Sequence, residues 1–367
     1  MNNSRKTRIF LFNFNVGSGI ENLGNTFCKM LREYEQEGGN IDIMEYKLQN
    51  PPCILIDALV KYKPDIIILN ETYTRTIKAV YYYKKCFPNT KAILINHTLS
   101  HLRNLPIKDE KANELLSHDE IVTTNYFMIN MVDKIINLNC YPDRNRHNYP
   151  DWLRKKTVDI LFPIDYRIFK KTKPFENRKI DFFYFGNVSN HRLSKEFLKL
   201  FDDLEHDMVL HVYGKLAGDE DYNRLILTSD KIIYHGYVKQ ENLVDTLNDC
   251  RFLINARAYG EPFFMSMGEA IMCGCIPMVV NDRKKKWSNW IDHYNGCYLE
   301  YQSNESLLSA MRKFNERRND TELLKLLDKT SSENAEEMKG RTDYERFKNL
   351  LISIVEGKTN QNAKCSL

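Results

Sequence analysis

Short apolar runs alternate with longer segments of helical periodicity along most of the chain. In the first half, the apolar runs predict strands and the periodic segments predict helices: strands over residues 8–15, 40–46, 64–69, 91–95, 120–124 and 158–162, and helices over 23–37, 54–62 and around 81–83. In the second half, the predicted strands are 179–185, 208–213, 231–235, 252–255 and 277–281, and the predicted helices are 193–204, 240–250, 262–273, 306–327 and 342–355. Strands that alternate with helices are typical of parallel α/β units. The pattern therefore predicts two successive α/β halves.

The two halves meet in a polar, lysine-containing stretch over residues 164–179. Pro163 precedes this stretch and Pro174 interrupts it, so we expect a linker here. The chain length of 367 residues also fits two domains, at roughly 100–200 residues each.

Composition and charge exclude several classes of protein. Hydrophobic residues make up 43% and charged residues 28% of the chain, as in globular proteins and unlike disordered or fibrous ones. The formal net charge is only +4, which disfavours a nucleic-acid-binding protein. The nine cysteines are odd in number and include no CxxC pair, so we expect reduced thiols and a cytoplasmic protein. The most apolar stretch, residues 263–280, contains Glu269, Gly274 and Pro277 and is not expected to span a membrane.

The strongest chemical signal lies in residues 260–277, where Glu261 and Glu269 are separated by seven residues. Pro262 suits the first turn of a helix and Gly274 suits its end. Free N–H groups at a helix start attract phosphate, and carboxylates accept hydrogen bonds from hydroxyl pairs. The segment could therefore hold the two ends of a nucleotide sugar. The alternative is that Glu261 only caps the helix and Glu269 lies at the surface, and periodicity alone favours that alternative.

The motif from Glu261 through Gly274 to Pro277 resembles the retaining glycosyltransferases of family 4 (glycosyl transferases group 1) and their GT-B relatives. The strand, helix and strand predicted over 231–255 precede it in the same order, and the ordered match covers about 179–281. The first half is more weakly similar, through Gly17, Gly19, residues 64–65, 96–97 and 163–165, and Phe169. The resemblance implies an α/β protein of GT-B architecture, with two Rossmann-like parallel-sheet domains that face a cleft.

Domain boundaries follow from combining that architecture with the sequence pattern. We expect an N-terminal Rossmann-like domain on the acceptor side, a linker, a C-terminal Rossmann-like domain on the nucleotide-sugar donor side, a helix that returns to the N-terminal domain, and a flexible tail. The expected bounds are 1–163, 164–179, 180–340, 341–356 and 357–367.

The resemblance also implies roles for the two carboxylates and their neighbours. Glu261 is expected to contact donor-sugar hydroxyls, and Glu269 is expected to bind the nucleotide ribose. Phe263 and Phe264 belong to the same donor-binding segment. The family usually has Glu-Gly-Phe-Gly where this chain has Glu-Pro-Phe-Phe, so Pro262 removes a backbone donor and Phe264 adds bulk. The sugar preference is therefore expected to differ from that of the family.

A pair of cations is expected at the first loop of the second domain. In the family, an Arg and a Lys there neutralise the donor pyrophosphate. Here Gly186 is followed by Asn187 in place of the usual Arg, and Arg192 and Lys195 are the nearest substitutes. A guanidinium and an ammonium suit a diphosphate leaving group. The alternative is that both side chains are solvated at a helix start.

The first half contributes three further candidate residues. His97 ends a predicted strand, and the resemblance implies that it reaches the donor sugar; the alternatives are a structural histidine or a role for His101 instead. Gly17 and Gly19 follow the first strand, where glycine permits close backbone approach to a ligand.

The sequence gives less evidence for a metal site or a membrane contact than for a donor site. Cys273 and Cys275 lack the partners that a zinc site needs, so no metal site is expected. The basic segment 283–286, with Trp287 and Trp290, suits an anionic acceptor, a peripheral membrane contact or the donor phosphate; the alternative is a solvated loop over packed tryptophans.

These residues predict an enzyme of glycan biosynthesis. We expect a retaining hexosyl- or related transferase that moves a sugar from a UDP- or GDP-sugar to a glycan, lipid or other hydroxyl acceptor. The catalytic candidates are Glu261, His97, Arg192 and Lys195. No cofactor is expected, because the protein itself supplies the cations. The alternatives are a GT-B epimerase or phosphorylase, and a non-catalytic module that binds nucleotides or sugars; the oligomeric state stays open.

Overall fold

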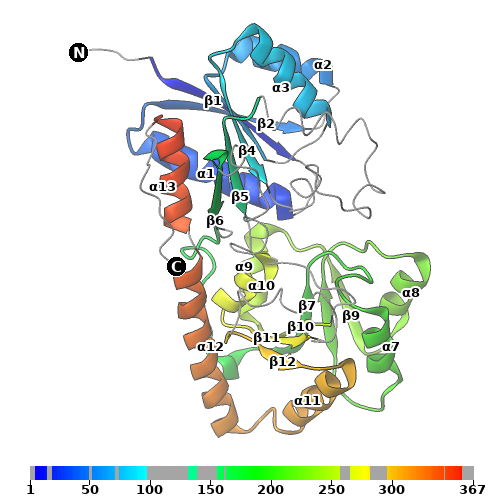
Figure 1. The fold of residues 1–367 in the computed structure, drawn as a ribbon. Helices are drawn as coiled ribbons and strands as arrows, with labels where there is room; N and C mark the ends of the chain where they lie inside the picture. Colours follow the sequence, from blue (N-terminus) through cyan, green and yellow to red (C-terminus); the bar gives the residue numbers. More distant parts are fainter. Residues whose placement is uncertain are drawn as a thin grey trace. The chain divides into compact units, whose positions relative to one another are not determined.

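A computed structural model describes ten segments of the chain: residues 5–14, 19–48, 52–70, 74–96, 131–138, 155–160, 163–256, 265–281, 296–342 and 344–357. The chain divides into two units (Figure 1). The first unit contains residues 1–163 and 343–367, and the second contains 164–342.

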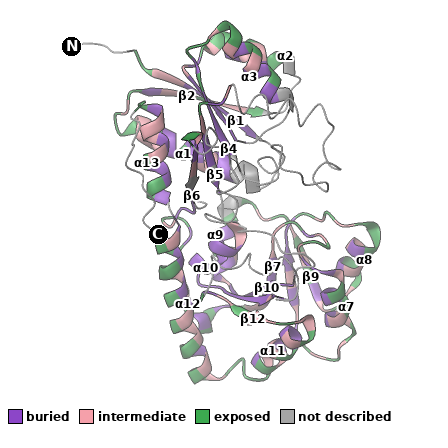
Figure 2. Cartoon of the chain, viewed as in Figure 1, coloured by how far each residue is buried: buried purple, intermediate pink, exposed green. Residues whose placement is uncertain are grey.

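The described part of the first unit has a parallel sheet of six strands, in the order β2-β1-β3-β4-β5-β6. Its strands are β1 (Thr7–Phe14), β2 (Ile41–Leu48), β3 (Ile66–Leu69), β4 (Lys91–Asn96), β5 (Lys134–Leu138) and β6 (Thr157–Ile160). Its helices are α1 (Gly19–Gln36), α2 (Pro52–Tyr62), α3 (Thr74–Cys86) and α13 (Tyr344–Val355). Every residue of β3 is buried, as expected for a central strand of a parallel sheet with both faces covered (Figure 2).

Helix α13 packs against α1, so the last described helix belongs to the first unit. The rings of Phe27 and Phe347 stack with their centroids 4.7 Å apart. The ammonium of Lys348 lies 3.0 Å from the carboxylate of Glu37 and 3.5 Å from that of Glu33. An aromatic stack flanked by ion pairs therefore fixes the two helices to each other.

The described part of the second unit has another six-stranded parallel sheet, in the order β12-β11-β10-β7-β8-β9. Its strands are β7 (Ile180–Phe185), β8 (Leu210–Tyr213), β9 (Ile232–Gly236), β10 (Cys250–Asn255), β11 (Ile276–Val280) and β12 (Leu299–Tyr301). Its α-helices are α7 (Lys195–Asp203), α8 (Glu220–Thr228), α9 (Gln240–Asn248), α10 (Met265–Met272), α11 (Asn304–Glu316) and α12 (Thr321–Arg341). The core on one face of this sheet joins side chains of α7, α8 and α11, with Phe314 edge-on to the rings of Phe182 and Phe252.

Residues 164–179 make polar contacts within the second unit. The ammonium of Lys171 lies 2.6 Å from the carboxylate of Asp328. The buried guanidinium of Arg178 donates to the backbone oxygens of Cys250, at 2.6 Å, and Cys273, at 2.7 Å. This segment is therefore hydrogen-bonded to α12, to the first residue of β10 and to the residue that follows α10.

The helix predicted over residues 306–327 is wrong, because the structure has two helices there. Helix α11 ends at Glu316 and α12 begins at Thr321. Asp320 caps the second helix, since its carboxylate accepts hydrogen bonds from the backbone N–H groups of Glu322 and Leu323. Apolar residues keep a helical spacing on both sides of this break, so the sequence pattern does not reveal where the first helix ends. The predicted strand 120–124 lies outside the described residues.

In the described segments, no helix combines the length and the hydrophobicity needed to cross a bilayer.

Candidate functional site

The second sheet reverses its strand order between β7 and β10. From β7 the chain adds β8 and β9 on one side, and it then returns to add β10, β11 and β12 on the other. In parallel sheets, the carboxyl ends of the two strands at such a reversal border a crevice in which ligands bind. The segments that follow β7 and β10 are therefore the first place to look for a site.

Two glycines at the ends of β7 and β8 bring the backbone close together. Gly186 has φ of +141° and Gly214 has φ of +136°, values that side chains rarely allow. A Cβ atom on Gly214 would lie 1.7 Å from the backbone oxygen of Gly186. A Cβ on Gly186 would lie 3.2 Å from the Tyr184 hydroxyl and 3.9 Å from Ser266 Oγ in α10. Gly186 thus lies between its own strand and the first turn of α10.

The loop after β7 is tied to both neighbouring strands. The Tyr184 hydroxyl donates to the backbone oxygen of Asn187 at 2.8 Å. Val188 forms a parallel bridge with Leu216, beyond the end of β8. The backbone N–H of Ser194 donates to the oxygen of Ala256, just after β10, at 2.7 Å. Hydrogen bonds therefore hold this loop across the point where the strand order reverses.

The N-terminus of α7 is already occupied by side chains of its own loop. Asn190 Oδ1 accepts from the backbone N–H of Lys195 at 2.8 Å. Ser194 Oγ accepts from the backbone N–H of Phe197 at 3.2 Å. These two N–H groups are not available to a ligand, whereas side chains of this loop carry positive charge.

Arg192 and Lys195 supply that charge, and both are half-buried. Lys195 is the first residue of α7, and its ammonium has no carboxylate within ion-pair distance among the described residues. An ammonium without a protein counter-ion suits an anionic ligand. Asn187 is exposed on the same loop.

Glu269 is the most unusual side chain at this edge of the sheet. It lies in the second turn of α10, a helix that is mostly buried (Figure 2). Glu269 is only 6% exposed. Its carboxyl makes no hydrogen bond or ion pair with any described residue. Burial alone raises the pKa of this carboxyl from 4.5 to about 7. Burial of an ionised carboxyl costs free energy unless a neighbouring group or a ligand hydrogen-bonds to it, so Glu269 is a candidate ligand-binding side chain.

Several candidates from the sequence lie in this region. Gly186, Asn187, Arg192 and Lys195 share the loop after β7 and the start of α7, and Glu269 lies on α10. Gly19 is in the first unit, where it begins α1. The remaining candidates fall outside the described residues: Gly17, His97, Glu261, Phe263 and Phe264. Roles for Gly214, Asn190 and Ser194 were not predicted from the sequence. The available signal for Gly214 was a glycine directly after a short apolar strand.

The first unit has a reversal of its own, between β1 and β3, with a buried polar network. The side-chain amide of Asn13, which is 1% exposed, donates to Asn25 Oδ1 and to Glu45 Oε1, both at 2.9 Å. Asn70 Nδ2 donates to Asn13 Oδ1 at 3.2 Å. A Cβ on Gly24 would lie 1.9 Å from Asn13 Oδ1. Asn13 thus joins three strands and α1.

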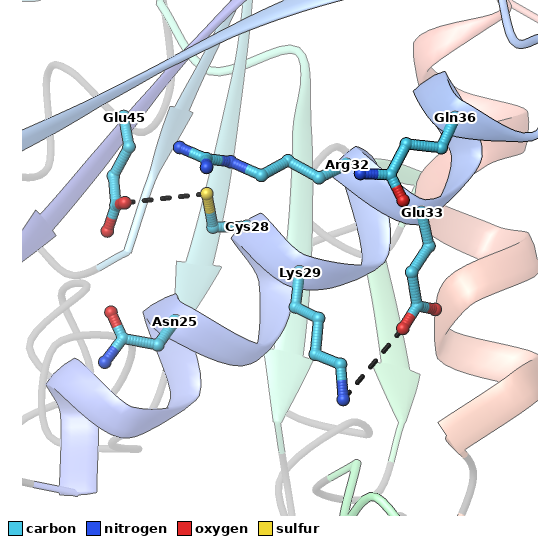
Figure 3. Close-up of a pocket in the computed structure, with 7 residues that line it drawn as sticks. All are labelled: Asn25, Cys28, Lys29, Arg32, Glu33, Gln36 and Glu45. Carbon is cyan, nitrogen blue, oxygen red and sulfur yellow. Dashed lines mark hydrogen bonds and ion pairs between the residues drawn. The ribbon is translucent and has the colours of Figure 1, made fainter.

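A polar cavity of about 450 Å³ adjoins this network, between one face of α1 and β2 (Figure 3). Its lining is Asn25, Cys28, Lys29, Arg32, Glu33, Gln36 and Glu45. The two cations and two anions in this lining balance, so the cavity does not favour a charged ligand. Burial, and secondarily the charge of Glu45, raises the pKa of the Cys28 thiol to about 11, so this thiol is not a nucleophile at neutral pH.

The fold and the site define a class of protein: two parallel α/β units, one of which has two closely packed glycines, two cations and a buried carboxyl on the elements around its strand-order reversal. Residues 165–336, nearly the whole second unit, match the family described as glycosyl transferases group 1. These residues are therefore similar to the glycosyltransferase domain of that group. The prediction that the protein is a glycosyltransferase is therefore confirmed.

Solved structures show the same fold over almost the whole chain. Anabaena Alr3699/HepE, in complex with UDP-glucose, is 12% identical, with a TM-score of 0.67 over 95% of this chain and 99% of that chain. Sucrose-phosphate synthase from Thermosynechococcus elongatus is 12% identical, with a TM-score of 0.66 over 96% and 99%. A glycosyltransferase from Rickettsia africae is 11% identical, with a TM-score of 0.61 over 98% and 100%. The predicted GT-B architecture is confirmed. No curated protein sequence matches this chain significantly.

Proposed function

We propose that the protein is a retaining glycosyltransferase whose nucleotide-sugar donor binds at the strand-order reversal of the second unit. The observation that supports this site best is Glu269, a buried carboxyl without a partner in the described residues, on the helix that contacts Gly186. A carboxylate can accept hydrogen bonds from both hydroxyls of a ribose, which would satisfy it. Anabaena Alr3699/HepE, which has this fold, binds UDP and UDP-glucose, so a UDP-sugar is the first donor to test, followed by a GDP-sugar.

The chemical step requires stabilisation of a departing diphosphate. We assign this role to the side chains of Arg192 and Lys195, because charge fixed where negative charge develops lowers the barrier. The N–H groups at the start of α7 that Asn190 and Ser194 already occupy do not take part. These two cations suffice for the proposal, so it invokes no metal ion at the diphosphate.

In the proposed mechanism, the direction of attack explains why the anomeric configuration of the sugar is retained. The acceptor oxygen attacks the anomeric carbon from the face that the diphosphate leaves, and the acceptor proton passes to a leaving phosphate oxygen. The C–O bond to phosphate breaks as the new glycosidic bond forms, so the anomeric configuration is kept. Glu261 is assigned to the donor-sugar hydroxyls and His97 to the sugar, both by resemblance.

The acceptor is assigned to the first unit and is proposed to be a glycan or a lipid-linked hydroxyl compound. Peripheral contact with a membrane, through residues 283–290, stays a prediction, because this segment lies outside the described residues.

Calorimetric titration with UDP tests the site. The wild-type protein should bind UDP, and Glu269→Ala should weaken binding by about 1.5–3 kcal/mol, as expected for lost hydrogen bonds to a charged group. Glu316→Ala, at an exposed carboxylate of α11, is the matched control and should bind like the wild type. Equal affinities of wild type and Glu269→Ala would contradict the assignment. Consumption of donor without any acceptor would instead favour an epimerase.

A further inference from the structure

Two histidines face each other on neighbouring strands of the second sheet. His211 is in β8 and His235 is in β9, the edge strand. Nδ1 of His211 lies 2.9 Å from Nε2 of His235, and the two ring planes are within 15° of parallel. Beyond this mutual contact, neither ring has another hydrogen-bond partner among the described residues.

A β-bulge creates this arrangement. Val212 pairs with Tyr234, but the next residue, Tyr213, pairs with Gly236, so His235 is an extra residue in β9. A bulge redirects the side chain of its extra residue. Here it brings the ring of His235 over that of Tyr213, with centroids 4.3 Å apart and planes within 9° of parallel. Tyr213 is buried and His235 is exposed, so the exposed ring rests on a fixed aromatic support.

A neutral imidazole has one ring nitrogen that carries a hydrogen and one with a lone pair, and only the nitrogen with the lone pair binds a metal. Each of the two facing nitrogens presents a lone pair when the hydrogen of its ring lies on the far nitrogen.

The separation of the two nitrogens is close to that of two nitrogens bound to one ion. Two nitrogens each about 2.1 Å from one ion are roughly 3.0 Å apart at a right angle and roughly 3.4 Å apart at a tetrahedral angle. The hydrogen-bonded nitrogens are 2.9 Å apart, so a shift of about 0.5 Å or less brings them to either spacing.

We propose that His211 and His235 form a two-histidine site for a divalent transition-metal ion, with Ni²⁺, Cu²⁺ or Zn²⁺ as the probe. Solvent completes the coordination, because in the described part of the chain no group of three or more His, Cys, Asp or Glu side chains is placed to hold an ion. The site is separate from the donor site and does not depend on the proposed transferase activity.

Titration of the full-length protein with NiCl₂ and with ZnCl₂ at pH 7.5 tests this site. Mutation of a residue that only orients a metal ligand weakens metal binding about 10–100-fold. Loss of a ligand itself should cost at least as much, so His211→Ala and His235→Ala should each weaken one Ni²⁺ site by at least about tenfold. Tyr213→Phe keeps the ring that supports His235 and should retain the site. His206→Gln is the matched control, because His206 contacts Phe201 and lies outside the pair. Circular dichroism confirms that each variant is folded.

Cu²⁺ electron paramagnetic resonance provides an independent measurement. The wild type should show coupling to two equivalent ring nitrogens, and each alanine variant should show one or none. Ni²⁺ and Zn²⁺ binding that is unchanged in both alanine variants would overturn the proposal.

Discussion

The backbone oxygen of Gly186 occupies the space that a side chain on Gly214 would need, because a Cβ there would lie 1.7 Å away. The close approach holds the ends of β7 and β8 together beside the proposed donor site. Gly214→Ala must move backbone atoms and also adopt φ of +136°. We predict a loss of roughly 2–4 kcal/mol in the free energy of unfolding and weaker UDP binding.

Urea denaturation and UDP titration measure the two effects of Gly214→Ala. Gly236→Ala is a useful comparison, because Gly236 also has positive φ but nothing lies within 4 Å of its added Cβ. It should lose less stability and keep its UDP affinity. Equal losses in both variants would show that the contact with Gly186 is unimportant.

We predict that Glu269→Gln lowers the affinity for UDP but raises the free energy of unfolding at high pH. Below pH 4.5, the Glu269 carboxyl is protonated in the folded and unfolded states alike. Between pH 4.5 and about 7 the unfolded chain releases a proton that the folded protein keeps, so the free energy of unfolding falls as the pH rises. Above pH 7 this cost is complete, at up to roughly 3 kcal/mol.

The neutral amide of Glu269→Gln does not titrate. Relative to the wild type, the variant should therefore be more stable at pH 8 than at pH 5, while its UDP affinity falls. Urea denaturation at both pH values measures the difference. The same stability difference at pH 5 and pH 8 would contradict the burial of an ionisable carboxyl.

Arg192→Ala and Lys195→Ala should weaken binding of UDP but not of uridine. Each removes a charge-assisted contact worth about 1.5–3 kcal/mol, which corresponds to roughly 10–100-fold in affinity. Lys199→Ala removes an exposed lysine one turn further along α7 and is the matched control. Calorimetry with both ligands distinguishes a phosphate contact from general damage. If UDP and uridine weaken equally, the cations do not contact the diphosphate.

Asn13→Ala should destabilise the first unit without changing UDP affinity. The side chain of Asn13 hydrogen-bonds Asn25, Glu45 and Asn70, and its removal leaves buried groups without partners. We expect a loss of roughly 2–4 kcal/mol in the free energy of unfolding. Denaturation followed by UDP titration of the folded variant tests this. A large change in UDP affinity would show that the hydrogen bonds of Asn13 support UDP binding.

The strands with continuous apolar sequences could be predicted from the sequence. Ile66–Leu69 and residues 252–254 of β10 are apolar and buried, and burial of both faces selects such runs. Strand β12 was missed because it has three residues, none of them buried, and no alternation. Helix α8 was also missed, although Asp219 caps it with a hydrogen bond from Tyr222 N–H.

The candidate site was only partly accessible to sequence reasoning. The positions of Gly186 and Lys195 follow from a strand that ends and a helix that begins nearby. The burial of Glu269 does not, because it depends on elements packed around α10 from distant parts of the chain. The proximity of Gly186 and Gly214 likewise depends on pairing between β7 and β8.

The most direct measurement of the central claim is turnover of a panel of UDP- and GDP-sugars with candidate hydroxyl acceptors, followed by proton NMR of the anomeric signal. The proposed function predicts that nucleoside diphosphate is released only when an acceptor is present, and that the product keeps the anomeric configuration of the donor. A product of inverted configuration would contradict retention. Donor consumption without an acceptor, or no binding of any nucleotide sugar, would contradict the proposed transfer itself.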